Sequence, residues 1–93
     1  MSVAIRLPTV LRSAASGKSI VNVDGDTIGQ VLEMLQRTYP AMSGQVLTQE
    51  GSLHRFVNVY VNDDDVRYLD KLDTKVAPDD VVSILPAVAG GAA

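Results

Sequence analysis

The fold of this chain is decided by residues 24–40, which read DGDTIGQVLEMLQRTYP. Thr27 and Gln30 are spaced as a capping box, whose two side chains accept hydrogen bonds from free backbone N–H groups at a helix start. The apolar residues of the segment share one helical face: Ile28, Val31, Leu32 and Leu35. Because Pro40 disfavours helical geometry at the residue before it, the helix should end at Tyr39. These signals predict one amphipathic helix of about three turns.

Two strands are predicted before this helix. Residues 3–7 alternate apolar residues with Ala4 and Arg6, which is the period of a half-buried strand. Pro8 should end its pairing, because proline cannot donate to a sheet. Residues 20–23 are rich in β-branched side chains and predict a second strand. The link between them is short and contains Gly17 as a turn residue, so the two strands should form an antiparallel hairpin.

The part after the helix predicts three more strands. Residues 56–61 alternate, with the three valines on one side: Val57, Val59 and Val61. A turn at 62–64 should be followed by a short strand at 66–69. A local turn at 72–76 should precede the last strand, 81–85, whose inner residues are Val82 and Ile84.

Residues 41–54, between the helix and the third strand, have the least regular pattern. Met42, Val46 and Leu47 indicate a short second helical turn, and the sequence at 50–52 indicates a loop.

The order strand, strand, helix, strand, strand, strand indicates an α+β roll, in which a helix covers one face of a single sheet. In a chain of 93 residues this order favours the β-grasp fold, with a mixed sheet of about five strands. Residues 1–86 should form the domain, and residues 87–93 a flexible tail. Periodicity alone leaves other α+β rolls open.

The composition excludes several classes of function. The chain has no cysteine, which excludes a disulfide scaffold, a thiolate nucleophile and a Cys-based zinc site. Its net charge is −3 and its Lys and Arg residues are scattered, so no nucleic-acid footprint is expected. No apolar run approaches the about 20 residues that span a bilayer, and the start does not resemble a signal peptide. We therefore expect a cytoplasmic protein that binds neither membrane nor nucleic acid.

Three further motifs contain residue types that occur in functional sites, but none predicts catalysis or metal binding. His54, the single histidine, lacks a partner nucleophile or metal-ligand cluster, so a loop position is expected. Asp63, Asp64 and Asp65 lack the spacing, glycine and closing glutamate of a calcium loop, and predict a solvated turn. The motif GDT at 25–27 lacks the lysine of a phosphate loop and predicts a helix cap.

The tail, residues 87–93, reads AVAGGAA and cannot build a core. It should project from the last strand as an extended peptide, because Gly90 and Gly91 would lose much backbone freedom on ordering. An ordinary frayed terminus is the plain alternative, since a Gly-Gly pair near an end is a weak signal by itself.

Taken with the body of the chain, the tail resembles a known family. The resemblance rests on residues 7–9, 25–27, 53–63 and 84–91, which read LPT, GDT, LHRFVNVYVND and ILPAVAGG. These motifs are similar to the prokaryotic ubiquitin-like sulfur carriers, which include the small subunit of molybdopterin synthase and the thiamine sulfur carrier. Within that family the chain most resembles the carriers that feed a cysteine synthase. The resemblance covers essentially the whole chain and implies the β-grasp fold.

The resemblance implies a chemical role for the tail. An E1-like activating enzyme would adenylate the carboxylate of Gly91 with ATP, and a sulfur donor would displace AMP to leave a thiocarboxylate. Val88, Ala89 and Gly90 would thread into the partner enzymes, where a glycine lets the walls approach closely. The acceptor would be a PLP-dependent cysteine synthase or another sulfur acceptor enzyme. In this interpretation the chain binds no cofactor itself and is a carrier, not an enzyme.

The sequence departs from the family in one place, because Ala92 and Ala93 follow the second glycine. We interpret the chain as a precursor that a JAMM-type zinc metallopeptidase cuts between Gly91 and Ala92. The alternative is that the two alanines are an artificial addition.

Two other functions remain open at this point. The same tail could form isopeptide bonds with lysines, as in a ubiquitin-like protein modifier, or the chain could be the small subunit of a molybdopterin-synthase-like complex. The sequence does not decide between acceptors, because acceptor choice lies in the partner enzyme.

A docking face for partners is predicted on the sheet. The helix can cover one face only, so strand alternation directs a second set of residues to the open face: Phe56, Tyr60, Val81 and Leu85. Aromatic and aliphatic groups on adjacent strands are typical of a contact patch. The alternative for Phe56 is a position under the loop of residues 41–54.

Overall fold

The computed structural model describes residues 2–55 and 57–86. Its helices and strands are β1 (Ser2–Arg6), α1 (Thr9–Arg12), β2 (Ile20–Asp24), α2 (Ile28–Thr38), β3 (Val57–Val61), β4 (Asp64–Asp65) and β5 (Val81–Pro86). Short 3-10 turns in the described part are η1 (Ser13–Ala15), η2 (Pro40–Met42), η3 (Val66–Tyr68) and η4 (Lys71–Asp73).

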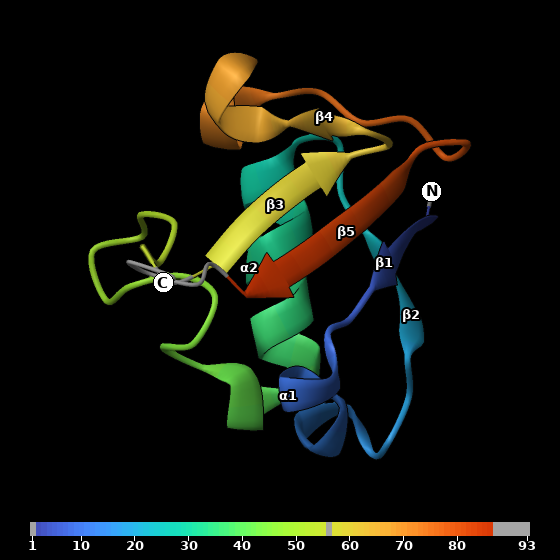
Figure 1. The fold of residues 1–93 in the computed structure, drawn as a ribbon, viewed down its shortest axis with the longest axis vertical. Helices are drawn as coiled ribbons and strands as arrows, with labels where there is room; N and C mark the ends of the chain where they lie inside the picture. The colour runs from blue at the N-terminus through green and yellow to red at the C-terminus, as the bar shows by residue number, and fades with distance from the viewer. Residues whose placement is uncertain (1, 56, 87–93) are drawn as a thin grey trace.

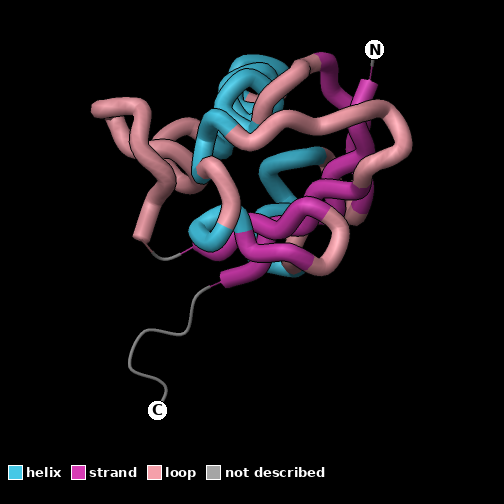
Figure 2. The backbone as a smooth tube through the Cα atoms, turned by 90° about the horizontal axis from the view of Figure 1, so that it is seen from above, coloured by secondary structure: helices cyan, strands magenta, loops and turns pink. Residues whose placement is uncertain are grey.

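The strands form one mixed sheet in the order β2-β1-β5-β3-β4 (Figure 1). β1 and β5 are parallel, whereas the β1–β2, β3–β5 and β3–β4 pairs are antiparallel. β5 is therefore the last strand in sequence and the middle strand in space. Figure 2 views α2 nearly end-on and shows the helix to one side of the strands. The predicted β-grasp roll, a mixed sheet with one main helix on one face, is confirmed.

Helix α2 begins and ends where the sequence predicts. The Thr27 hydroxyl accepts a hydrogen bond from the Gln30 N–H at 3.2 Å. The Gln30 side chain accepts from the Asp26 N–H at 2.8 Å, one residue earlier than the reciprocal capping box would have it. At the other end the Tyr39 N–H donates to Leu35 O at 2.9 Å, and Pro40 then opens η2.

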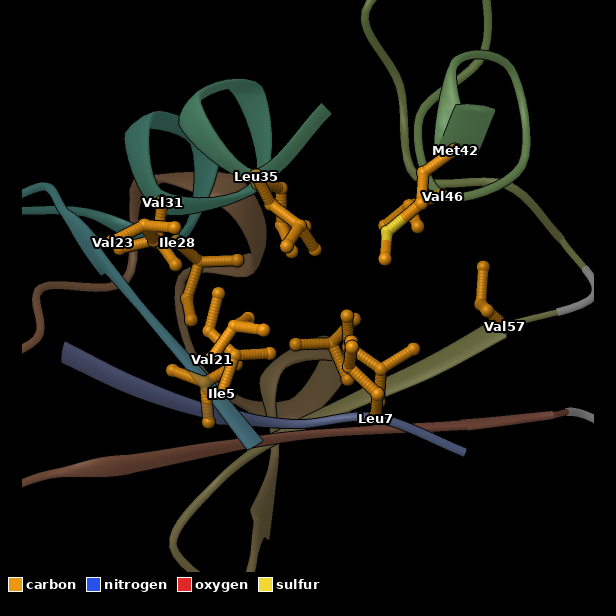
Figure 3. Packing of buried hydrophobic residues seen from close by; sticks show 14 of the residues in the cluster. Ile5, Leu7, Val21, Val23, Ile28, Val31, Leu35, Met42, Val46 and Val57 are labelled. Carbon is orange, nitrogen blue, oxygen red and sulfur yellow. The ribbon is translucent and has the colours of Figure 1, made fainter. Parts of the chain in front are cut away.

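The core lies between α2 and the covered face of the sheet (Figure 3). The four apolar residues of the predicted helix face are each 0% exposed: Ile28, Val31, Leu32 and Leu35. The predicted inner residues of β3 and β5 are also buried: Val57, Val59, Val61, Val82 and Ile84. Burying each such side chain contributes about 1.5–3 kcal/mol, so this contact is the main source of stability.

The loop after α2 is fixed to the helix by one side chain. Gln36 Oε1 accepts from the Leu47 N–H at 2.9 Å and from the Val46 N–H at 3.3 Å. Met42, Val46 and Leu47 are buried as their pattern indicates. The helical turn predicted here is limited to the 3-10 turn η2.

The prediction of a strand at 66–69 is wrong, because Val66–Tyr68 is the 3-10 turn η3. The Asp65 carboxylate accepts from the Arg67 N–H at 2.9 Å, and this cap begins the turn. The strand lies earlier, at Asp64–Asp65, directly after a tight turn in which Asn62 has φ +57°.

Helix α1 is absent from the sequence prediction. Pro8 marks the end of β1 but also precedes Thr9–Arg12 as the N-cap residue of a short helix. Only Leu11 of α1 is buried, so the four-residue helix has too little apolar periodicity to be recognised.

Candidate functional site

The predicted reactive residues Gly91 and Ala92, and the predicted threading residues Val88, Ala89 and Gly90, lie outside the described residues. The strand that carries them is described to its end at Pro86. β5 pairs with β1 on one side and β3 on the other, so the tail is attached to the middle strand of the sheet.

The end of β5 has a defined neighbour. Pro86 lies opposite Val57, the first residue of β3, and Leu85 lies opposite Asn58. The Val57 N–H donates to His54 O at 3.1 Å, and Val57 O accepts from Arg67 Nη2 at 3.1 Å. The backbone N–H and C=O groups of Val57 thus both form hydrogen bonds with residues outside β5. A proline is tolerated at position 86 because this pair exchanges no hydrogen bond.

Three of the four predicted docking residues lie on the open face of the sheet. Leu85 is 46% exposed, whereas Tyr60 and Val81 are half-buried. Tyr60 pairs with Ser83 of β5, so Val81 and Leu85 are its diagonal neighbours. Diagonal neighbours lie about 7–8 Å apart, within reach of an aromatic ring. The fourth predicted residue, Phe56, lies outside the described residues.

Two residues of this face were missed in the sequence. Ile20 of β2 is 52% exposed and pairs with Arg6 of β1, and Arg6 also pairs with Ser83 of β5. The open face therefore combines apolar groups with one guanidinium. The signal for Ile20 was present, because Val21 and Val23 occupy the opposite parity of the same strand.

Asn58 is the polar residue nearest to the end of β5 on this face. Its Oδ1 is buried and has no hydrogen-bond partner in the described part of the molecule. An unsatisfied buried acceptor costs about 1–3 kcal/mol, and such groups are unusual in a folded protein.

The other motifs considered in the sequence, His54 and the three aspartates, lie in a loop, a turn and a strand. His54 is half-buried in a loop, where its backbone N–H donates to Val46 O at 2.8 Å. The three aspartates divide between the tight turn (Asp63) and β4 (Asp64 and Asp65). Within residues 2–55 and 57–86, no group of three or more His, Cys, Asp or Glu side chains could hold a metal ion. No helix in the same ranges is long and apolar enough to cross a membrane.

Comparison with known proteins agrees with this geometry. A sequence model of the ThiS family matches residues 5–91. The sulfur carrier protein CysO of Mycobacterium tuberculosis is 46% identical over 93 residues, covering 98% of this chain and 100% of CysO. Small archaeal modifier protein 3 of Haloferax volcanii is 36% identical, covering 98% of this chain and all of the modifier.

A solved structure shows the same fold. A chain in the crystal structure of the Amycolatopsis orientalis BexX/CysO complex superposes with a TM-score of 0.86 and 38% identity, covering 96% of this chain and 99% of that one. The family match spans nearly the whole chain, and its relatives share both fold and length. The chain is thus a CysO-like, ubiquitin-like protein that belongs to the ThiS family.

Proposed function

We propose that this protein carries sulfur as a thiocarboxylate on Gly91 and delivers it in biosynthesis, most simply of cysteine. One observation supports this above others: a sulfur carrier is 46% identical over nearly the whole chain. The Gly-Gly motif at 90–91 lies within the part that the family model matches.

The chemistry needs ATP and a sulfur donor, neither of which the carrier supplies. A carboxylate oxygen of Gly91 attacks the α-phosphate of ATP, which releases pyrophosphate and leaves an acyl-adenylate. Hydrosulfide then attacks the acyl carbon, AMP leaves and a proton is released, so the product is a thiocarboxylate. An E1-like enzyme performs both steps, and the carrier acts as substrate and binds no cofactor. Because activation consumes ATP, we expect the reaction to occur in the cytoplasm.

Maturation has to come first. The carboxyl group of Gly91 is in a peptide bond with Ala92, so it cannot attack ATP in this chain. A JAMM-type zinc metallopeptidase that cuts this bond would expose it.

Partner recognition is proposed to use the open face of the sheet together with the tail. Val81 and Leu85 lie on β5, the strand from which the tail leaves, Tyr60 lies on the neighbouring β3, and Phe56 precedes β3 in sequence. An enzyme that takes the tail has to approach the end of β5 that carries Leu85, and aromatic and aliphatic groups on this face are suitable contact residues. The relative in a complex with BexX supports the idea that CysO-like chains assemble with partner enzymes. A PLP-dependent cysteine synthase is the acceptor we propose here.

A second function, protein modification, has specific support. The relative from Haloferax volcanii is described as a modifier, and it covers 98% of this chain. The same activated Gly91 would then be attacked by a lysine amine instead of hydrosulfide, and the product would be an isopeptide.

Mass spectrometry of the intact chain distinguishes the two functions. A chain ending at Gly91 is incubated with the activating enzyme, ATP and sulfide. Replacement of one oxygen by one sulfur supports the carrier. A ladder of larger conjugates in cells, with no thiocarboxylate formed in vitro, would support the modifier instead.

A further inference from the structure

A groove lies on the β3–β4 side of the sheet, apart from the open face. It has a volume of about 810 Å³ and runs between the loop that precedes β3 and the η3–η4 segment. In Figure 1 the loop lies to the left of the start of β3, and the η3–η4 segment, in orange, lies above β3. Apolar side chains line part of it: Leu53, Val66 and Leu72. Val66 is 1% exposed, and Leu53 and Leu72 are partly buried against the core. The apolar lining of the groove is therefore packed against the core of the domain.

The rim of the groove carries more positive than negative groups. Arg55, Arg67 and Lys71 line it together with Asp70 and Asp73, and Lys71 lies in η4 between the two aspartates. The groove therefore gathers three of the eight Lys and Arg residues of a chain whose net charge is −3. Within the described ranges neither Arg67 nor Lys71 forms an ion pair. Arg67 Nη2 donates a hydrogen bond to the backbone oxygen of Val57 at 3.1 Å.

The groove lies close to the point where the tail leaves the domain. Arg67 holds Val57, and Val57 lies opposite Pro86. Residues 87–91, fully extended, reach at most about 17–18 Å. An enzyme whose active site holds Gly91 therefore has to lie against this end of β3 and β5, beside the groove.

We propose that the groove is a second docking site, which takes an acidic segment of the activating enzyme with an apolar side chain at its centre. The inference rests on the proposed function, because it assumes that an enzyme takes the tail. The charge argument favours this occupant. Carboxylates of a partner are repelled by most of an acidic chain and attracted at this rim, where cations outnumber carboxylates, which fixes the orientation of docking. The apolar lining then accommodates an aliphatic side chain, which adds affinity.

Lys71 and Lys75 provide a matched pair for the test. Both are exposed and lie four residues apart, but only Lys71 lines the groove. Lys71→Glu and Lys75→Glu change the net charge equally, so any general effect of charge is the same in both. Lys71 has φ +55°, in the left-handed region. Glutamate, like lysine, has an unbranched Cβ, so the substitution leaves the conformational cost of this φ nearly the same.

The experiment measures binding by calorimetry between the chain ending at Gly91 and the activating enzyme, without ATP. We expect Lys71→Glu to raise Kd about tenfold and Lys75→Glu less than about twofold. High salt should weaken the unchanged chain more than the Lys71→Glu variant. Equal effects of the two substitutions, or no effect of either, would overturn the groove as a docking site.

Pyrophosphate exchange on the same preparation tests the proposed function separately. If exchange occurs but the two lysine variants have the same Kd, the groove is not a docking site and the proposed sulfur-carrier function stands. If no exchange occurs but the two lysine variants still differ in Kd, the groove is a docking site and the proposed adenylation of Gly91 is wrong. Absence of both binding and exchange overturns both.

Discussion

Pro86, the last residue of β5, lies opposite Val57, the first residue of β3, and the backbone of Val57 is held from its other side by Arg67. The strand end that precedes the tail therefore lies beside the start of β3, which is itself bonded to Arg67 of η3. The chemistry proposed for the tail depends on residues that follow this strand end in the sequence.

Removal of Ala92 and Ala93 should switch the chain from inert to active. The full chain should give no ATP–pyrophosphate exchange with the activating enzyme, whereas a chain ending at Gly91 should be adenylated, because only the latter has a free glycine carboxylate. Equal exchange by the two forms would exclude the precursor interpretation.

Gly91→Ala in the trimmed chain should reduce thiocarboxylation about a hundredfold. A Cβ in a closely fitted channel displaces the carboxylate, and a misplacement of about 1 Å can have this effect on rate. The melting temperature should not change. A lower melting temperature together with normal sulfur transfer would show that Gly91 has a structural role instead.

Tyr60→Ala or Leu85→Ala should weaken binding to the activating or acceptor enzyme by about 1 kcal/mol or more, in the range of a modest interface contact. Stability should fall far less than for Val59→Ala, which truncates a side chain that is 0% exposed. Asn22→Ala, on the same face but on the edge strand β2, two strands away from β5, is the matched control. Calorimetry that gives unchanged affinity for both enzymes would leave recognition to the tail and the groove.

Asn58→Leu should raise the free energy of unfolding by about 1 kcal/mol, because it removes a buried acceptor that has no partner in the described residues. If Asn58 is kept for binding, the same variant should bind the partner enzyme more weakly. Denaturant titration measures the first effect and calorimetry the second. A loss of stability would mean that the amide has a stabilising role in the fold.

Gln36→Ala should lower the free energy of unfolding by about 1–3 kcal/mol, since the Val46 and Leu47 N–H groups both lose their acceptor. Gln45→Ala is a suitable control, because Gln45 is exposed and its side chain donates to Ala41 O at 2.9 Å. Urea titrations of the two variants should separate clearly. Similar values would show that the loop holds its position without Gln36.

The elements that the sequence predicted correctly are those with local signals. α2 has a cap, a repeated apolar face and a proline at its end, all within residues 27–40. β3 and β5 alternate in the way that a half-covered sheet requires, so their inner residues could be named in advance.

The features that were missed depend on contacts between distant residues. Nothing around Arg67 indicates that its guanidinium binds Val57 O ten residues away, and nothing around Gln36 indicates that it holds Leu47. The strand predicted at 66–69 failed because one carboxylate, that of Asp65, favours a turn over an extended backbone. The tail residues that the family resemblance singles out lie outside the described residues, so their roles stay predictions.

The position of β5 has a consequence for synthesis. A nascent chain that has not yet reached Val81 holds a β1–β2 hairpin and a β3–β4 hairpin with no strand between them, each with an unpaired edge. The parallel β1–β5 contact joins segments about eighty residues apart in sequence, a pairing of high contact order that forms late. The sheet can therefore close only after the strand that precedes the tail has been synthesised. A truncated chain that lacks β5 would leave the facing edges of β1 and β3 unpaired.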